Sequence, residues 1–358
     1  MFKFALSALI SLLFAMTPAE AAKVEQRGST ATVKKQVVKK RVAKKPRYKR
    51  REAIGAKRVT VNKRDKTVRR VIMVRGKRKV VYQRMAPAAP VFRTFTAGDK
   101  AGLNLTRDPL DLSSSVALVL DQTNSEVLFE KNAGVALPIA SITKLMTGLI
   151  VVEAQQDMDE MLTVTDDDVD REKFTTSRLR VGSRLSRREM LHIALMSSEN
   201  RAAAALGRNY PGGIQGFVAA MNAKARELGM NDTRYVDSSG LSSRNVASAR
   251  DLAKLVMAAH QQPLLREFST DPGSTVAAGG RTMQYRNTNY LVSLPDWDIG
   301  LQKTGFINEA GRCLVMQTII QGRAVIMVFL DSKGKQSRTA DAGRMRRWLE
   351  ALKPPGLS

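Results

Sequence analysis

A serine and a lysine three residues apart could form a nucleophile and its base. Ser141 and Lys144 open an apolar stretch, and a helix over residues 141–155 would place both side chains on one face. Free lysine, with a pKa of ~10.4, is protonated at neutral pH. Burial in such a helix and a second ammonium nearby, for which Lys303 is the candidate, would lower this pKa. Lys144 could then take the Ser141 proton during attack on a carbonyl, and the Ser141 N–H could stabilise the resulting oxyanion.

Two further short motifs add groups that acyl transfer needs. They are S-E-N over residues 198–200 and K-T-G over residues 303–305. Ser198 could relay a proton to a leaving amine, and the Asn200 amide could bind a peptide group of the substrate. Gly305 would let an extended substrate lie along a strand without a Cβ in the way.

Each motif also has an ordinary structural explanation. Ser141 could only cap a helix, Lys144 could lie on its surface, Ser198 and Asn200 could cap the next helix, and Lys303 could be an exposed strand lysine. However, a lysine inside a helix with little polar face is costly unless it has a task. The three motifs also follow in one order, with 57 residues separating the serines and 105 from Ser198 to Lys303. The combination favours the catalytic interpretation.

The elements that must position these motifs follow from hydrophobic periodicity. Residues 115–120 and 126–130 are expected to form a hairpin. Further helices are expected over residues 185–195, 202–206, 214–228, 251–259 and 340–352, and strands over 299–302, 313–320 and 324–330. Strands at both ends with helices between them predict an α/β fold of the α+β type, with one mostly antiparallel sheet covered by helices.

The N-terminus has the pattern of a secretory signal peptide. Lys3 precedes an apolar run over residues 4–16, and an A-x-A cleavage site covers residues 19–21. We therefore expect residues 1–22 to be removed on export and the protein to be periplasmic, with an uncleaved anchor as the alternative. Export also makes nucleic acid an unexpected partner.

The positive charge of the chain is concentrated in one segment. Residues 23–85 carry +22 of the net +26, and residues 86–358 carry +4. Dense like charge predicts disorder in the first half of this segment, and a hairpin is expected over residues 68–82. We divide the remainder into an Ala/Pro linker over residues 86–110 and one catalytic domain over residues 111–353.

The cysteine and the histidines are expected to be structural. Cys313 is the sole cysteine and lies in an apolar strand-like run, which predicts a buried, inert thiol. His192 lies in an apolar helical run and is expected in the core or half-buried. His260 is the other histidine. No cluster has metal-ligand spacing, so neither a metal nor another cofactor is expected.

With these motifs, residues 112–350 resemble the D-alanyl-D-alanine carboxypeptidase A family of low-molecular-mass penicillin-binding proteins. The run over residues 303–313 looks like the D-Ala-D-Ala endopeptidase branch, the penicillin-binding protein seven type. Other matching runs cover residues 131–133, 137–140, 221–225, 228–230 and 239–241.

The resemblance implies a β-lactamase/transpeptidase-like fold, with a five-stranded antiparallel sheet and a helical subdomain. It implies Ser141, Lys144 and Ser198 as catalytic residues. It also implies substrate binding by a second set: Asn200, Lys303, Thr304, Gly305, Phe306 through its backbone N–H, and Arg338. The implied substrates are peptidoglycan stem peptides, with β-lactams as inhibitors.

Several functions compete at this stage. We predict a serine DD-endopeptidase that hydrolyses D-Ala–diaminopimelate cross-links, with a carboxypeptidase that trims pentapeptide stems as the alternative. Glu199 and Arg201 stand where the family often has Gly and Asp. A β-lactamase would need a deacylating glutamate, and Glu227 and Glu267 lack a recognisable loop context. The last alternative is an inactive protein that binds an anionic envelope surface through residues 23–85. For the enzyme itself, the charge of residues 23–85 is expected to hold it near an anionic wall or membrane surface, with a solvated tether as the alternative.

Overall fold

The computed structural model describes residues 67–74, 77–84 and 95–352. The predicted signal peptide, the first part of the basic segment and the start of the predicted linker lie outside the described residues. The chain divides into two units, over residues 1–88 and 89–358. None of the helices in the described ranges has the length and apolar character needed to cross a membrane.

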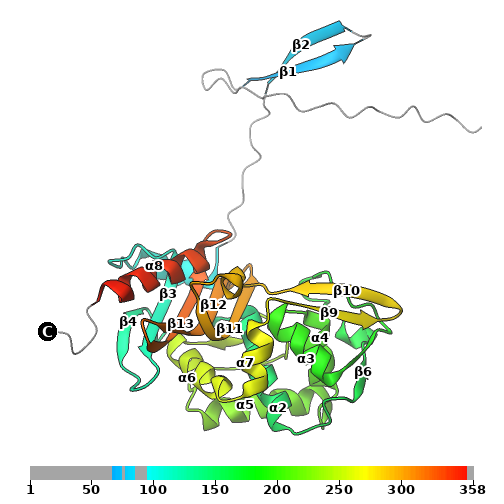
Figure 1. The fold of residues 1–358 in the computed structure, drawn as a ribbon, viewed down its shortest axis with the longest axis vertical. Coiled ribbons are helices and arrows are strands. Elements are labelled where there is room, and N and C mark those ends of the chain that lie inside the picture. Colours follow the sequence, from blue (N-terminus) through cyan, green and yellow to red (C-terminus); the bar gives the residue numbers. More distant parts are fainter. Residues whose placement is uncertain (1–66, 75–76, 85–94, 353–358) are drawn as a thin grey trace, which may run out of the picture. The chain divides into compact units, whose positions relative to one another are not determined.

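In the first unit, two antiparallel strands form a hairpin (Figure 1). β1 (Thr67–Val74) pairs with β2 (Lys77–Arg84), close to the hairpin expected over residues 68–82. Lys77 and its two basic neighbours are exposed, and Tyr82 is 68% exposed.

The second unit is built around a five-stranded antiparallel sheet with the order β11-β12-β13-β3-β4. Its strands are β3 (Ser114–Asp121), β4 (Val127–Lys131), β11 (Asp298–Ile307), β12 (Gly311–Ile320) and β13 (Arg323–Ser332). Three two-stranded ladders complete the strands: β5 (Leu137–Pro138) with β8 (Val246–Ala247), β6 (Met161–Thr163) with β7 (Arg184–Ser186), and β9 (Gly273–Ala278) with β10 (Arg281–Arg286). The sheet confirms the predicted fold class.

Helices supply most of the remaining structure. The α-helices are α1 (Ala97–Lys100), α2 (Thr143–Glu153), α3 (Arg187–Met196), α4 (Asn200–Arg208), α5 (Gly213–Glu227), α6 (Ala249–His260), α7 (Pro263–Thr270) and α8 (Ser337–Ala351). The 3-10 turns are η1 (Leu103–Leu105), η2 (Ala140–Ile142), η3 (Asp166–Asp168) and η4 (Tyr290–Ser293). Sequence periodicity missed α7 and the β9–β10 hairpin.

The two faces of the sheet bury different layers. Along β3, Ala117 and Val119 belong to a cluster with Met345 of α8, whereas Val116 and Leu118 belong to the cluster formed by the inner helices. Alternate residues of a strand point to opposite faces, so one strand serves both layers. Helix α8 covers one face, and α6 covers the other (Figure 1).

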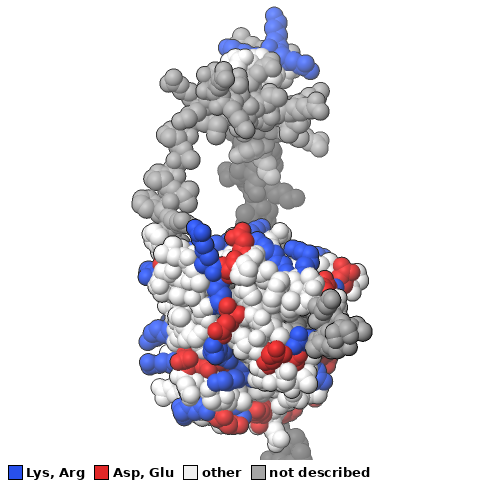
Figure 2. Space-filling view, turned by 90° about the vertical axis from the view of Figure 1, so that its left-hand side faces the viewer, with Lys and Arg blue, Asp and Glu red and all other residues white. Residues whose placement is uncertain are grey.

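The second unit begins earlier than residue 111. Helix α1 and turn η1 lie inside the range predicted as a linker, and the Ala97 N–H donates to the Glu309 carbonyl at 2.8 Å. Gly98 is buried against Asp331, where a Cβ would collide with its carboxylate. The Ala-Pro composition therefore does not extend as linker to residue 110, because residues 95–110 pack on the sheet unit. On the face seen in Figure 2, basic and acidic side chains of this unit are interspersed.

Candidate active site

The Ser141 side chain lies at the start of α2, in turn η2. Ala140, directly before Ser141, has a positive φ of 49°, and helix α2 begins at Thr143. The Lys144 ammonium donates to Ser141 Oγ at 2.9 Å. The three-residue spacing therefore brings the two groups into direct contact, as the sequence predicted.

Lys144 is fully buried and has three oxygen acceptors. Besides Ser141, its ammonium donates to Asn200 Oδ1 at 2.8 Å and to the Ser239 carbonyl at 2.6 Å. Burial lowers the pKa of Lys144 to about 8, against the opposing influence of the Asp237 and Glu199 charges. A lysine with this pKa can accept a proton near neutral pH.

The second motif sits at the start of α4. Ser198 has a φ of 62°, and Glu199 caps the helix by accepting the Arg201 N–H. Asn200 turns its oxygen to Lys144 and donates from Nδ2 to Thr175 Oγ1 at 3.0 Å. Glu199, rather than Ser198 or Asn200, is thus the cap of this helix, which leaves the other two side chains for the site.

The third motif lies on the edge strand β11. Lys303 is fully buried, and its ammonium donates to Ser198 Oγ at 2.9 Å and to the Thr304 carbonyl at 3.0 Å. Burial first, and then the charges of Lys144 and Arg338, hold the pKa of Lys303 well below its usual range. The side chain of Thr304 is hydrogen-bonded to that of Thr288 at 2.7 Å.

Lys144 and Lys303 are both buried, and burial is the first cause of the lowered pKa of each. The sequence predicted that burial and a second ammonium would lower the pKa of Lys144; burial does so, and the charge of Lys144 adds to the lowering of the Lys303 pKa. When two cations interact, the one that loses its proton first feels the other's charge, and the second then titrates beside a neutral neighbour. The repulsion between the two ammonium groups is mutual, so removing either charge favours the protonated form of the other.

With the three motifs in place, the chain can be compared with known proteins. The profile of the D-alanyl-D-alanine carboxypeptidase family matches residues 104–334. The chain belongs to this family.

The relatives to which the chain is similar are named as endopeptidases or as a transpeptidase. The chain is 52% identical to a D-alanyl-D-alanine endopeptidase of Pseudomonas aeruginosa, covering 70% of this chain and 81% of the relative. It is 44% identical to a D-alanyl-D-alanine endopeptidase of Escherichia coli, covering 71% and 83%. A Streptomyces K15 DD-transpeptidase structure has a TM-score of 0.63 and 25% identity, covering 69% of this chain and 100% of that one. The predictions of family, transpeptidase-like fold and serine-type D-Ala-D-Ala peptidase are confirmed.

Gly305 of this D-alanyl-D-alanine carboxypeptidase family member lies very close to the turn that carries Ser141. A Cβ there would lie 2.8 Å from the Ile139 carbonyl oxygen and 3.2 Å from the Ser141 nitrogen. The missing side chain thus lets β11 lie directly against the turn that carries the nucleophile. This close approach is an additional reason for glycine here, and room for a substrate along the strand stays a prediction.

Of the remaining two predicted substrate-binding residues, Phe306 lies on β11 and Arg338 lies on α8 next to it. Phe306 is 50% exposed, and the Arg312 guanidinium stacks on its ring at 4.6 Å from the centroid. Arg338 of α8 donates from Nη1 to the Gly305 carbonyl at 2.7 Å. Burial lowers the pKa of Arg338 to about 10. Arg338 therefore holds the backbone of β11, a contact that the sequence did not suggest.

Residues 239–241, which the sequence analysis noted only as a matching run, belong to a loop whose contact with Lys144 was not predicted. Asp237 accepts backbone N–H groups from Ser239 and Gly240 at 2.7 and 2.6 Å, which turns the Ser239 carbonyl to Lys144. Gly240 has a φ of 80°, and a Cβ there would lie 2.0 Å from the Ala140 carbonyl oxygen. An aspartate followed three residues later by glycine is a turn signal that could have indicated this loop.

The histidine and cysteine expectations are confirmed. Cys313 is buried, and burial raises its pKa to about 12. His192 is half-buried, stacks on Phe268 at 4.5 Å and lies 2.8 Å from Asp271.

Glu227 is exposed and pairs with Lys224, and Glu267 is exposed on α7. Neither glutamate is therefore a candidate for the deacylating base of a β-lactamase.

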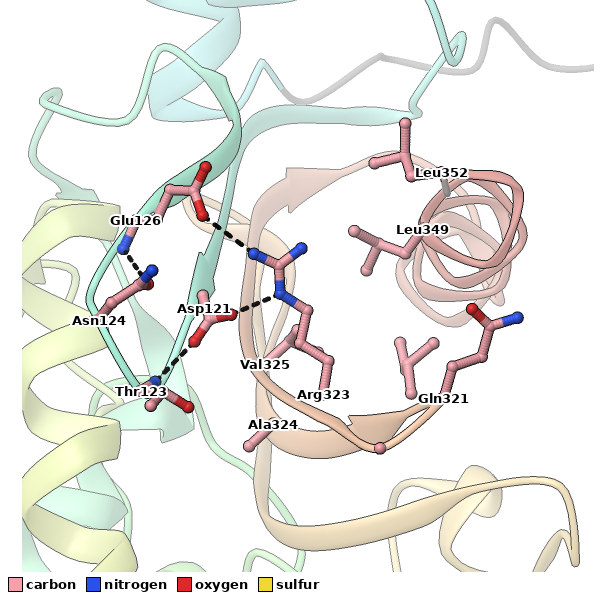
Figure 3. Close-up of a pocket in the computed structure, with 12 residues that line it drawn as sticks. Asp121, Thr123, Asn124, Glu126, Gln321, Arg323, Ala324, Val325, Leu349 and Leu352 are labelled. Atoms are coloured by element: carbon pink, nitrogen blue, oxygen red, sulfur yellow. Dashed lines mark hydrogen bonds and ion pairs between the residues drawn. The ribbon is translucent and has the colours of Figure 1, made fainter. Parts of the chain in front are cut away.

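A separate pocket lies at the opposite end of the sheet (Figure 3). It is lined by the ends of β12 and β13, and there Arg323 pairs with Asp121 and Glu126. Gly305 is paired with Cys313, seven residues before Ile320 in this pocket, which is about 20 Å along the strand. With its charges paired and no serine–lysine pair, this pocket does not belong to the catalytic site.

Proposed function

We propose that the protein is a DD-endopeptidase that hydrolyses D-Ala–diaminopimelate cross-links of peptidoglycan through an acyl-enzyme on Ser141. The observation that carries the proposal is the buried Lys144 ammonium, held against Ser141, Asn200 and the Ser239 carbonyl with a lowered pKa. The endopeptidase names of the Pseudomonas aeruginosa and Escherichia coli relatives support the choice of bond.

Acylation follows from the contacts of the first two motifs. Neutral Lys144 takes the hydroxyl proton of Ser141 while Ser141 Oγ bonds to the D-Ala carbonyl carbon. The backbone N–H groups of Ser141 and Phe306 are proposed to hold the oxyanion, because Gly305 allows β11 to lie against the nucleophile turn. The carbon–nitrogen bond then breaks, and the leaving amine receives a proton through Ser198.

The other motif residues bind and align the substrate in this proposal. Lys303 is hydrogen-bonded to Ser198 and aligns its hydroxyl, while Thr304 and Gly305 lie on the edge strand along which an extended peptide can pair. Asn200 positions Lys144 through its oxygen. Arg338 acts through the Gly305 carbonyl, as a positioning residue. Water then enters where the amine left and hydrolyses the Ser141 ester.

The cellular setting is also part of the proposal. The A-x-A pattern at residues 19–21 supports export to the periplasm, where stem peptides are the substrates and β-lactams the acylating inhibitors. We propose four parts along the chain: a signal peptide over residues 1–22, a basic segment over residues 23–85, a linker that ends before α1, and a catalytic domain that includes α1.

The basic segment is proposed to hold the enzyme near an anionic envelope surface. Its net charge of +22 and the exposed Lys77, Arg78 and Lys79 of β2 support this partner. Basic residues near an anionic membrane contribute about 1 kcal/mol each, within a Debye length of about 8 Å.

A carboxypeptidase that trims pentapeptide stems remains the second candidate, because the matched family profile carries that name. The two activities require the same serine chemistry and differ in the leaving group. An intact serine–lysine contact argues against an inactive binding protein.

Digestion of purified muropeptides with product identification by mass spectrometry tests the proposal. We expect cross-linked dimers to be converted to monomers, and Ser141→Ala to abolish both this activity and covalent labelling by a fluorescent penicillin. Ser113→Ala, which removes a hydroxyl just before β3, is the matched control. Resistant dimers together with pentapeptides that lose their terminal D-Ala would establish the carboxypeptidase instead. Labelling that survives Ser141→Ala would remove Ser141 as nucleophile.

A further inference from the structure

A groove rich in arginine lies beside the catalytic motifs. It has a volume of about 600 Å³ and runs between the loop before β7 and strand β10. We call it the arginine groove, and its lining comprises Ser177, Arg178, Arg180, Arg281, Met283, Gln284 and Arg286.

The arginines of the groove make no ion pairs within the described part of the protein. None of its four arginines takes part in an ion pair between described residues, and its lining contains no Asp or Glu. All four side chains are exposed. Cations gathered along one concave surface repel each other and raise the local concentration of anions. The groove is therefore suited to a ligand that brings negative charge.

The two walls of the groove are fastened to each other. Arg178 reaches across from the loop, donates to the Gln284 carbonyl of β10 and stacks over the Tyr285 ring at 4.8 Å from its centroid. The Tyr285 ring is buried and gives this contact a fixed base. Arg178 is thus held in place and joins the two walls before a ligand arrives, which lowers the ordering cost of binding.

Both walls also connect to the catalytic motifs. On the loop, Thr175 accepts from Asn200 at 3.0 Å, and Ser177 donates to Glu199 at 2.5 Å. On the other side, β10 leads to Thr288, whose hydroxyl is hydrogen-bonded to that of Thr304 at 2.7 Å. The groove therefore lies next to the second and third motifs, to which the elements that form both of its walls are connected by hydrogen bonds.

We propose that the arginine groove binds the free carboxylates of peptide stems, at a distance from the bond that is cut. This inference rests on the proposed function. Stem peptides carry carboxylates at γ-linked D-glutamyl and at diaminopimelyl residues, and a cross-linked dimer presents these on two stems. Guanidinium groups pair with carboxylates through two parallel hydrogen bonds. Binding energy gained in the groove aligns the cross-link over Ser141.

Binding to a catalytically silent protein tests the groove independently of turnover. In full-length protein carrying Ser141→Ala, the Kd for a fluorescent cross-linked stem-peptide dimer is compared with the Kd for the same dimer with its carboxyl groups amidated. Arg180→Gln combined with Arg286→Gln removes one charge from each wall and leaves Arg178 in its packed position. The matched control is Arg107→Gln combined with Arg226→Gln, two exposed arginines outside the groove.

We expect the groove substitutions to weaken binding of the carboxylate dimer about tenfold, and the control substitutions to leave it unchanged. The amidated dimer should bind weakly and equally to all three proteins. An unchanged Kd in the groove variant, or an equal loss in the control, would overturn the proposal. Failure of the wild-type enzyme to cut dimers would overturn the endopeptidase function alone, because this binding measurement does not depend on cleavage.

Discussion

Opposing influences on one ammonium set the reactivity of Ser141. Complete burial favours the neutral form of Lys144, whereas the charges of Asp237 and Glu199 favour the charged form. The balance leaves the pKa at about 8, so that about a tenth of the molecules carry a neutral Lys144 at pH 7. This fraction is enough for general-base catalysis and explains why the base can be a lysine.

The pH dependence of acylation follows from this pKa. We expect the rate of labelling by a fluorescent penicillin to increase about tenfold for each pH unit below about 8, and to level off above about pH 9, because only neutral Lys144 accepts the Ser141 proton. Stopped-flow measurement of labelling between pH 5.5 and 9.5 checks this. A rate that does not change over this range would exclude Lys144 as the titrating base.

Lys303 offers a second test at the same scale. We expect Lys303→Ala to reduce acylation on the order of a hundredfold, because Ser198 loses its hydrogen-bond partner. The midpoint of the pH profile should move upward, because removing the Lys303 charge favours the charged form of Lys144. An unchanged midpoint would show that Lys303 does not tune Lys144. Retained activity would make Lys303 structural only.

At the scale of elements, the three motifs could be predicted from the sequence, whereas several contacts that surround them could not. The helix that starts at the nucleophile was visible because the apolar residues after Ser141 repeat along one helix. The Ser239 carbonyl and the Arg338–Gly305 contact were not visible, because backbone acceptors carry no residue signature and the partners are far apart in sequence.

The β9–β10 hairpin shows the same limit. Gly279 and Gly280 at its turn are a recognisable signal, but β9 buries only Val276 and Ala278. Too few apolar residues therefore alternate for a strand to be predicted. Helix α7 was missed because it is short and starts at a proline directly after α6, which reads as the end of a helix.

The close contact at Gly305 belongs to this scale and can be tested. Gly305→Ala should push β11 away from the nucleophile turn and reduce acylation at least tenfold, because the new Cβ would lie 2.8 Å from the Ile139 carbonyl oxygen. Gly134→Ala is the control, since its Cβ would meet nothing within 4 Å. Penicillin labelling rates and thermal melting measured on both variants separate a local effect from loss of folding. Equal behaviour of the two variants would contradict the argument.

At the scale of the whole molecule, charge is divided between two units. Residues 23–85 carry +22, and the much longer remainder from residue 86 carries +4. An exposed two-stranded hairpin with a basic β2 gains little from folding alone, so its charge is the property that a partner can use.

Deleting residues 23–85 tests whether this segment serves in attachment and the second unit in catalysis. Turnover of soluble cross-linked dimers should stay within twofold of wild type, whereas the protein should leave envelope fractions at low salt, because the deletion removes the electrostatic attraction. In the full chain, glutamine at Lys77, Arg78 and Lys79 should weaken retention in the same direction. Retention of the deleted protein at low salt would show that the segment is only a spacer.

The place where the chain enters the catalytic unit has a mechanical consequence. Helix α1 is fastened by the Ala97–Glu309 hydrogen bond to the turn directly after β11, and by the Asp99–Lys333 ion pair to the residue after β13. A force that pulls on the N-terminal segment would therefore act first on the C-terminal end of β11, the strand that carries Lys303 and Gly305. Tension between an anchored segment and the wall would reach the catalytic strand without passing through the helical core.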